Sequence, residues 1–234
     1  MRLIYLFLTI LILGSCGTKA RLKKENLKDY FPKIEDFETP KVLIYELDSI
    51  GKKSHVYYLI ERKGETELFI IKFNAQFIQT EHQLVEFKDD GVYLKEAFIV
   101  EDFESNLLTK IEVKNNMVFP FDPSLAVNSY ERSIQFQMDT AVIYKMVTDW
   151  QFEELTTKYI VDSKKKTIIA RGTHRTREIF TDWNSDGEIE GVLELWYTKG
   201  LGMTKAMLSY GKDHFSETYI ETISVGAFEE LKTH

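Results

Sequence analysis

Residues 175–198 read RTREIFTDWNSDGEIEGVLELWYT, which is two runs rich in aromatic and aliphatic residues on either side of a turn signal. The runs, residues 175–181 and 188–198, have the composition and length of β-strands. The residues between them, ending in Ser185-Asp186-Gly187, are typical of a tight turn. Two strands joined by a tight turn pair in the antiparallel sense, so this stretch predicts a β-hairpin.

The register of this hairpin sets which residues share a face. If Asn184 closes opposite Gly187, Arg177 faces Glu194 and Arg175 faces Trp196. One face is then mainly apolar, and it carries Phe180, Ile189, Leu193, Leu195 and Tyr197. On the other face, the basic run 171–177 lies against Glu188, Glu190 and Glu194. A salt-paired, solvated face is the favoured interpretation of this basic run, and a ligand-binding basic patch is the alternative.

The same pattern of short strands and turns continues through the chain from residue 41. Residues 133–139 show it most clearly, because Ile134, Phe136 and Met138 alternate with polar residues. The strands expected besides 133–139 are 42–47, 55–61, 67–73, 92–100, 108–113, 142–148, 157–161, 167–171, 175–181, 188–198, 204–210 and 215–224. About a dozen antiparallel strands predict an all-β fold in one strongly curved sheet, either a half-barrel or a barrel-like sandwich.

Few segments depart from this pattern. Residues 26–31 are expected to form one helical turn that Pro32 stops. Two prolines in residues 119–123 predict a break in pairing there, which we interpret as a crossover loop. Residues 232–234 are expected to be a frayed end.

The composition excludes several classes of protein. The chain has 234 residues, and its 16 Phe, 12 Tyr and 3 Trp favour sheet over helix. Only 4 Pro are present, which excludes a collagen-like or low-complexity chain. The net charge of −7 argues against nucleic-acid binding. The single Cys excludes an internal disulfide and any metal site built on several cysteines.

Residues 1–15 have the features of a signal peptide. Arg2 supplies a positive charge, and residues 3–13 form the apolar run LIYLFLTILIL. As a helix this run would span about 16 Å, roughly half of a bilayer core. The run is therefore too short for a stable membrane span.

The order Leu13-Gly14-Ser15-Cys16 resembles the lipobox of bacterial lipoproteins. That resemblance implies cleavage before Cys16, a diacylglycerol on its thiol and an acyl chain, such as palmitate, on its new amino group. An ordinary signal peptide with an incidental Cys is the alternative. The expected organisation is a signal peptide over 1–15, a lipidated Cys and basic tether over 16–28, and a single β-rich domain over 29–234.

Acyl chains on Cys16 would anchor the protein to a membrane almost irreversibly. Residues 17–28 carry a net charge of +4 and residues 29–234 a net charge of −12. The tether is thus expected either to lie on anionic headgroups or to act as a solvated linker. Gly17 stands where lipoproteins retained in the inner membrane commonly have Asp, which implies the outer membrane in a Gram-negative cell. A position facing the periplasm is expected there, and a surface-facing leaflet is the alternative.

Residues 197–205, YTKGLGMTK, match the pattern Y-x-K-G-x-G-x-x-K. With this motif the domain resembles β-rich envelope lipoproteins, some of which are similar to the lipoprotein-carrier half-barrel that holds acyl chains. The resemblance implies an apolar concavity that binds an apolar ligand. Taken alone, Lys199-Gly200-Leu201-Gly202 is interpreted as a glycine turn between two strands, in preference to a phosphate-binding loop.

Residues 182–190, DWNSDGEIE, match the first nine positions of a calcium loop. Asp182, Asn184, Asp186 and the Glu188 carbonyl are the candidate ligands. Position 12 is Leu193 where a bidentate Glu is needed, and the flanks are expected to be strands. A metal-free hairpin turn is the favoured alternative, and no other cofactor is expected.

No enzyme signature is present, since the chain lacks nucleophile elbows, HExxH motifs, phosphate loops and dinucleotide fingerprints. The five histidines have no metal-ligand spacing, and each is expected at a surface or hairpin position: His55, His82, His174, His214 and His234.

Three functions remain open. The first is a non-enzymatic, lipid-anchored envelope lipoprotein that binds an apolar ligand or lipid in its curved sheet. The second is a structural or assembly subunit that binds another envelope protein through that sheet. The third is a hydrolase whose site has no recognisable motif.

Overall fold

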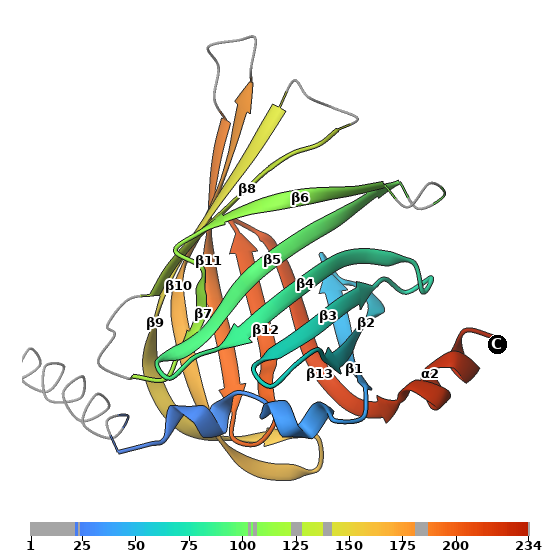
Figure 1. Ribbon diagram of the computed structural model, residues 1–234. Helices are drawn as coiled ribbons and strands as arrows, with labels where there is room; N and C mark the ends of the chain where they lie inside the picture. The colour runs from blue at the N-terminus through green and yellow to red at the C-terminus, as the bar shows by residue number, and fades with distance from the viewer. Residues whose placement is uncertain are drawn as a thin grey trace, which may run out of the picture.

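The computed structural model describes residues 22, 24–102, 104, 107–122, 128–137, 142–180 and 187–233 (Figure 1). The order along the chain is two 3₁₀ turns, thirteen strands and a short C-terminal helix. The elements are η1 (Leu27–Tyr30), η2 (Ile34–Phe37), β1 (Lys41–Ser49), β2 (Lys52–Arg62), β3 (Glu67–Phe73), β4 (Gln79–Phe87), β5 (Gly91–Asp102), β6 (Leu107–Lys114), β7 (Met117–Pro120), β8 (Asn128–Gln135), β9 (Val142–Ile160), β10 (Ser163–Phe180), β11 (Gly187–Thr198), β12 (Gly202–Tyr210), β13 (Asp213–Ser224) and α2 (Val225–Leu231).

Twelve of the strands close into an antiparallel barrel. Strand β1 pairs with β2 on one side and with β13 on the other, and the pairing of β4 with β5 completes the ring. Strand β7 is the additional strand and pairs with β5. The predicted all-β class and curved antiparallel sheet are confirmed. Full closure satisfies the backbone groups that the edges of an open half-barrel would expose.

The hairpin of β9 and β10 is the longest element, with strands of 19 and 18 residues. Together with β8 and β11, one end of it extends beyond the other strands in Figure 1. The segments expected as separate strands, 142–148 with 157–161 and 167–171 with 175–181, are therefore parts of these two continuous strands. The pairing of β10 with β9 shifts its register between Ile169 and Ala170, and such an irregularity allows the two long strands to bend.

The predicted register of the next hairpin, β10 with β11, is wrong. Arg177 faces Glu188, and it is Arg171 that faces Glu194. The prediction assumed the tightest turn, but pairing begins with Glu178 opposite Gly187, so the connection is longer than two residues. The observed register differs from the predicted one by an even number of residues. Each residue of the hairpin therefore keeps its predicted face.

The structure differs from the sequence predictions at two further places, strand β4 and residues 119–123. Strand β4 was not predicted, because its polar residues mask the alternation. The predicted break at 119–123 is partly wrong, because Phe119 and Pro120 belong to β7 and pair with Val92 and Gly91. Pro120 is tolerated because it is the last residue of the short strand β7, which in the described part of the chain pairs with β5 on one side only.

Residues 24–40, which we call the N-terminal strap, cross one end of the barrel (Figure 1). Leu27 and Tyr30 of η1 are fully buried in the main core, and Ile34 and Phe37 of η2 join the same core. The expected helical turn before Pro32 is confirmed as η1. The strap therefore closes this end of the barrel with apolar side chains.

The helix α2 was not predicted, and it ends at Leu231, directly before residues 232–234 that were expected to fray. It begins at an N-cap, where the Ser224 hydroxyl accepts a hydrogen bond of 3.2 Å from the Ala227 amide. Its Phe228 packs on the outside of the barrel in a second cluster with Val42, Tyr57 and Phe73. None of the helices described is long and apolar enough to cross a membrane.

Candidate functional site

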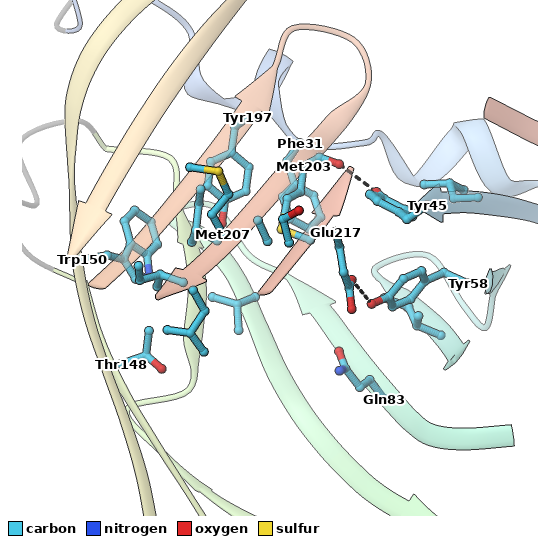
Figure 2. Close-up of a pocket in the computed structure, with 18 of the residues that line it drawn as sticks. Phe31, Tyr45, Tyr58, Gln83, Thr148, Trp150, Tyr197, Met203, Met207 and Glu217 are labelled. Atoms are coloured by element: carbon cyan, nitrogen blue, oxygen red, sulfur yellow. Dashed lines mark hydrogen bonds between the residues drawn. The ribbon is translucent and has the colours of Figure 1, made fainter. Parts of the chain in front are cut away.

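The barrel contains a cavity of about 530 Å³ (Figure 2). This volume falls in the range of about 300–1,000 Å³ that is typical of small-molecule sites. Most of the cavity wall is apolar, and it is formed by side chains of eleven strands together with the strap. The apolar ring and methyl groups come from residues such as Phe31, Leu43, Trp150, Leu195 and Met207.

The alternation of the strands explains why these side chains point inward. On β1, Leu43, Tyr45 and Leu47 occupy every second position and all line the cavity. On β11, Leu193, Leu195 and Tyr197 do the same, which confirms the apolar face predicted for this strand.

The strap closes one end of the cavity through aromatic contacts. The ring of Phe31 lies 5.3 Å from that of Phe119 and 5.6 Å from that of Phe87. Phe31 and the neighbouring Pro32 both line the cavity. This end is therefore built from side chains that pack as a hydrophobic core.

The motif at residues 197–205 fastens the strap to the barrel. Gly200 and Gly202 have φ angles of +77° and +84°, which confirms the predicted glycine turn between β11 and β12. The amide of Gly200 donates a hydrogen bond of 2.8 Å to the Asp29 carbonyl, and Lys199 Nζ lies 2.9 Å from the Asp29 carboxylate. Lys166 adds an ion pair of 2.9 Å with Glu25.

Aromatic rings line the wall beside the strap. Trp150 and Tyr197 point into the cavity (Figure 2), and Phe152 lies 5.1 Å from the Trp150 ring. Opposite Trp150 on β10 is Gly172. A Cβ on Gly172 would lie 2.6 Å from the Trp150 Cα, so only glycine permits this close approach of the strands.

One cluster of polar side chains in the wall surrounds Glu217, and hydrogen bonds and an ion pair within the cluster satisfy this carboxylate. The Glu217 carboxylate accepts a hydrogen bond of 2.5 Å from the Tyr58 hydroxyl and forms an ion pair of 2.6 Å with Lys72. Burial, together with the adjacent Glu217 charge, raises the pKa of Tyr58 well above its usual value. Tyr45 donates a hydrogen bond of 2.7 Å to the Met203 carbonyl. These contacts hold the wall in place and leave Glu217 neutralised.

A second polar group contains Tyr130, Arg132, Thr148 and His174, all of which line the cavity. The Thr148 hydroxyl lies 2.8 Å from His174 Nδ1. Burial, and then the nearby Arg132 charge, lower the pKa of His174, so the imidazole is neutral at pH 7. His174 was expected at a surface or hairpin position, and it lies on a hairpin strand, but the alternation of β10 places it inside the barrel, where it is 9% exposed.

Most residues proposed from motifs lie outside the described part of the chain. This applies to Cys16 and to the calcium candidates Asp182, Asn184 and Asp186. Glu188 is described, and it is an exposed residue of β11 opposite Arg177. Among the residues that are described, no group of three or more His, Cys, Asp or Glu side chains could hold a metal ion.

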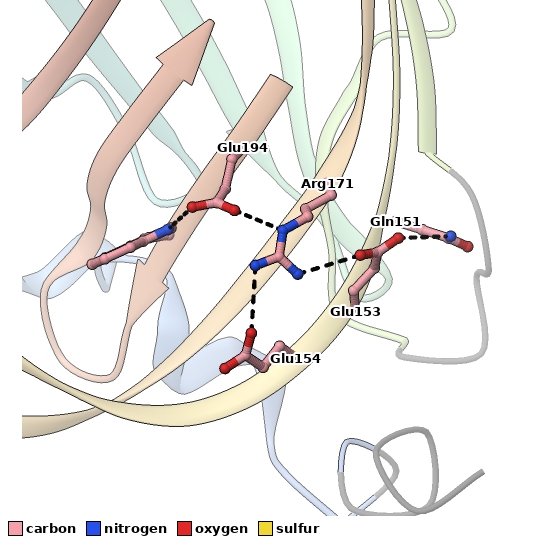
Figure 3. Close-up of polar contacts among 6 residues, drawn as sticks. Gln151, Glu153, Glu154, Arg171 and Glu194 are labelled. Atoms are coloured by element: carbon pink, nitrogen blue, oxygen red, sulfur yellow. Dashed lines mark hydrogen bonds and ion pairs between the residues drawn. The ribbon is translucent and has the colours of Figure 1, made fainter. Parts of the chain in front are cut away.

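The basic run on the outer face forms ion pairs, as the favoured interpretation predicted. Arg171 contacts Glu194 at 2.6 Å and reaches Glu153 and Glu154 at 3.4 Å each (Figure 3). Glu194 also accepts a hydrogen bond of 2.6 Å from the Trp196 indole. Arg175 instead pairs with Asp149 of β9 at 2.6 Å.

The sequence analysis named no residue of this cavity as ligand-binding, although some of the inward positions could be read from the sequence. The inward positions of β1 and β11 follow from their alternation. The polar groups could not be found in this way, because Lys72, Glu217, Arg132 and His174 come from four strands that are distant in sequence.

Comparison with known proteins shows that the fold occurs in two solved bacterial structures. No protein-family profile matches the chain, and no curated protein matches it significantly. A "putative lipoprotein" from Parabacteroides distasonis superposes with a TM-score of 0.53 at 11% identity, covering 83% of this chain and 98% of that one. A "putative exported protein with YmcC-like fold" from Bacteroides fragilis gives a TM-score of 0.54 at 8% identity over the same shares. At these identities the likeness shows a shared fold, and neither description states an activity.

Proposed function

We propose that the protein is a non-enzymatic lipoprotein of the cell envelope whose barrel binds an apolar or amphiphilic ligand. Acyl chains on Cys16 anchor it to the outer membrane, facing the periplasm. The cavity of about 530 Å³ inside the closed barrel is the observation that carries this proposal. The shared fold with proteins described as lipoproteins or exported proteins supports the location in the envelope.

The chemistry of the cavity wall favours binding over catalysis. The Glu217 carboxylate is engaged by Tyr58 and Lys72, and the His174 imidazole contacts Thr148. In the described residues no carboxylate is paired with His174 as a catalytic base would require. The wall offers a ligand mainly apolar contact, which contributes about 25 cal/mol for each Å² buried.

Binding can be tested with protein made without residues 1–16. Native mass spectrometry of detergent-free protein would reveal a co-purified lipid, and titration with the neutral dye N-phenyl-1-naphthylamine would report the apolar cavity. We expect saturable binding of the dye. The variant Ala206→Trp places an indole in the cavity wall and should weaken this binding at least tenfold.

The matched control is Val192→Trp. Val192 is 63% exposed on the outer face of the adjacent strand, so this change adds the same side chain outside the barrel. Binding should be unaffected in this control. No co-purified lipid and no saturable binding by the unmodified protein would remove the ligand-binding proposal and favour a subunit that binds another envelope protein.

A further inference from the structure

Arg132 is the charged side chain of the cavity wall whose hydrogen-bonding capacity is least used. It lies on β8, between Val113 of β6 and Met146 of β9, and its side chain is 21% exposed. Its Nε atom is buried and has no hydrogen-bond partner within the described residues. A buried guanidinium N–H without a partner is unfavourable unless a ligand supplies the acceptor.

The nearest carboxylate does not satisfy Arg132. Arg132 Nη1 lies 3.7 Å from Glu81 Oε1, which is longer than a hydrogen bond. That same Glu81 oxygen accepts a hydrogen bond of 2.8 Å from Gln83 Nε2. Glu81 is also not part of the cavity wall, so it does not stand between Arg132 and a ligand.

Arg132 is the charged side chain of the cavity wall that keeps a buried donor without a partner among the described residues. Glu217 is the carboxylate in the wall, and Lys72 neutralises it at 2.6 Å. The His174 imidazole is uncharged, because burial and the Arg132 charge lower its pKa. A ligand anion in this part of the cavity would therefore meet Arg132 as the charged donor of the wall.

The surroundings of Arg132 fix the guanidinium and add further polar groups. Its Cζ lies 5.4 Å from the centre of the Tyr130 ring, a stacking distance that holds the group in place. The Thr148 hydroxyl and Gln83 amide belong to the same wall. In contrast, the part of the wall formed by Phe31, Trp150 and Tyr197 is aromatic.

We propose that Arg132 binds the anionic head of a single-chain amphiphile whose apolar chain occupies the remainder of the cavity. This inference rests on the proposed ligand-binding function and specifies its ligand class. A guanidinium matches carboxylate and phosphate oxygens with parallel N–H donors. A fatty acid and an alkyl phosphate share this chemistry, and a fatty alcohol of the same length lacks it.

Competition against bound N-phenyl-1-naphthylamine tests the inference with three probes of one chain length: palmitate, hexadecyl phosphate and hexadecanol. At pH 7.5 either anion should displace the dye at a concentration at least tenfold lower than hexadecanol does, which corresponds to about 1.4 kcal/mol. A preference for one anion over the other separates a carboxylate ligand from a phosphate ligand. The variant Arg132→Gln should remove the preference over hexadecanol while leaving hexadecanol displacement unchanged, and Arg132→Lys should restore part of it.

The matched control is Arg175→Gln. Arg175 also has a buried Nε without a partner among the described residues, but it lies on the outer face and pairs with Asp149. This control should keep the full preference for anions. Melting curves of all variants establish that each is folded.

The outcomes separate the inference from the function on which it rests. Displacement by all three probes at equal concentrations would overturn the anionic-head assignment and leave the cavity as an apolar site. Loss of the preference in Arg175→Gln as well as in Arg132→Gln would also overturn it, because the effect would then be non-specific. Absence of dye binding and of displacement by any probe would overturn the ligand-binding function itself.

Discussion

A Cβ atom on Gly202 would lie 2.6 Å from Cδ of Pro32, so the β11–β12 turn is in direct contact with the N-terminal strap. The contact joins two segments far apart in sequence, and it requires a residue without a side chain. It explains the second glycine of the motif at residues 197–205. It also means that this turn helps to close the end of the cavity where Phe31 and Pro32 lie.

The variant Gly202→Ala should lower stability through two effects. Its φ of +84° disfavours a residue with a side chain by about 1–2 kcal/mol. The clash with Pro32 should add about 1–3 kcal/mol. Gly200→Ala is the matched control, because its φ is +77° but nothing lies within 4 Å of the added Cβ. Urea unfolding should therefore show a larger loss for Gly202→Ala, and equal losses would contradict a tight contact with the strap.

The variant Gly172→Ala should destabilise the long β9–β10 hairpin severely. The added Cβ would lie 1.8 Å from the Asp149 carbonyl oxygen, a backbone atom that cannot move without breaking strand pairing. We expect a loss of more than about 3 kcal/mol or failure to fold, at the upper end of overpacking effects. Gly64→Ala places its Cβ in open space and should change the melting temperature little. A normal melting temperature for Gly172→Ala would show that the two strands are further apart than described.

The Arg171 network should contribute modestly and depend on salt and pH. Burial acts to raise the pKa of Glu194, but hydrogen bonds from Trp196 and Arg171 outweigh it, and the pKa is lowered from its usual 4.5. A lowered carboxyl pKa stabilises the fold above pH 4.5, and this contribution is lost as the pH falls through the folded-state pKa.

The variant Arg171→Gln should accordingly cost up to about 1 kcal/mol at pH 7 and low salt, because these side chains are partly exposed. Chemical unfolding at pH 7 and pH 3, with and without 1 M salt, measures this cost. The difference from the unmodified protein should shrink at pH 3 and in salt. Lys53→Gln removes a single exposed pair with Glu46 and should have a smaller effect. A cost for Arg171→Gln that is the same at both pH values would show that the loss comes from packing.

Lipidation of Cys16 predicts the mass and location of the mature protein. Intact-mass measurement of membrane-extracted protein should show loss of residues 1–15 and the added mass of acyl chains. Cys16→Ala should move the protein from the membrane to the soluble fraction, because the chain then lacks its anchor. Retention of Met1, or a Cys16 without acyl mass, would rule out the lipobox assignment.

Several features of the fold could be predicted from the sequence because they depend on neighbouring residues. The alternation of Leu193, Leu195 and Tyr197 defined an inward face, since successive side chains of a strand point to opposite sides. The two glycines of residues 199–202 indicated a turn, since their φ angles are positive. The single turn before Pro32 was predicted for a similarly local reason.

The register of β10 with β11 was not predictable, because registers that differ by two residues present the same faces to core and solvent. Arg177 could therefore be assigned to the correct face but to the wrong partner. Strand β4 was missed because its polar inward residues, such as Gln83, do not show the apolar alternation of an ordinary strand.

The sequence alone determined the strand alternation, the antiparallel class and the turn at Gly200 and Gly202, all of which are local properties of the chain. Only the tertiary structure decided that the sheet closes through β4 and β5, and that His174 and Arg132 both line one cavity. Closure depends on the summed twist and pairing of all twelve strands. The cavity, with Arg132 in its wall, is formed by residues that come together only when that ring is complete.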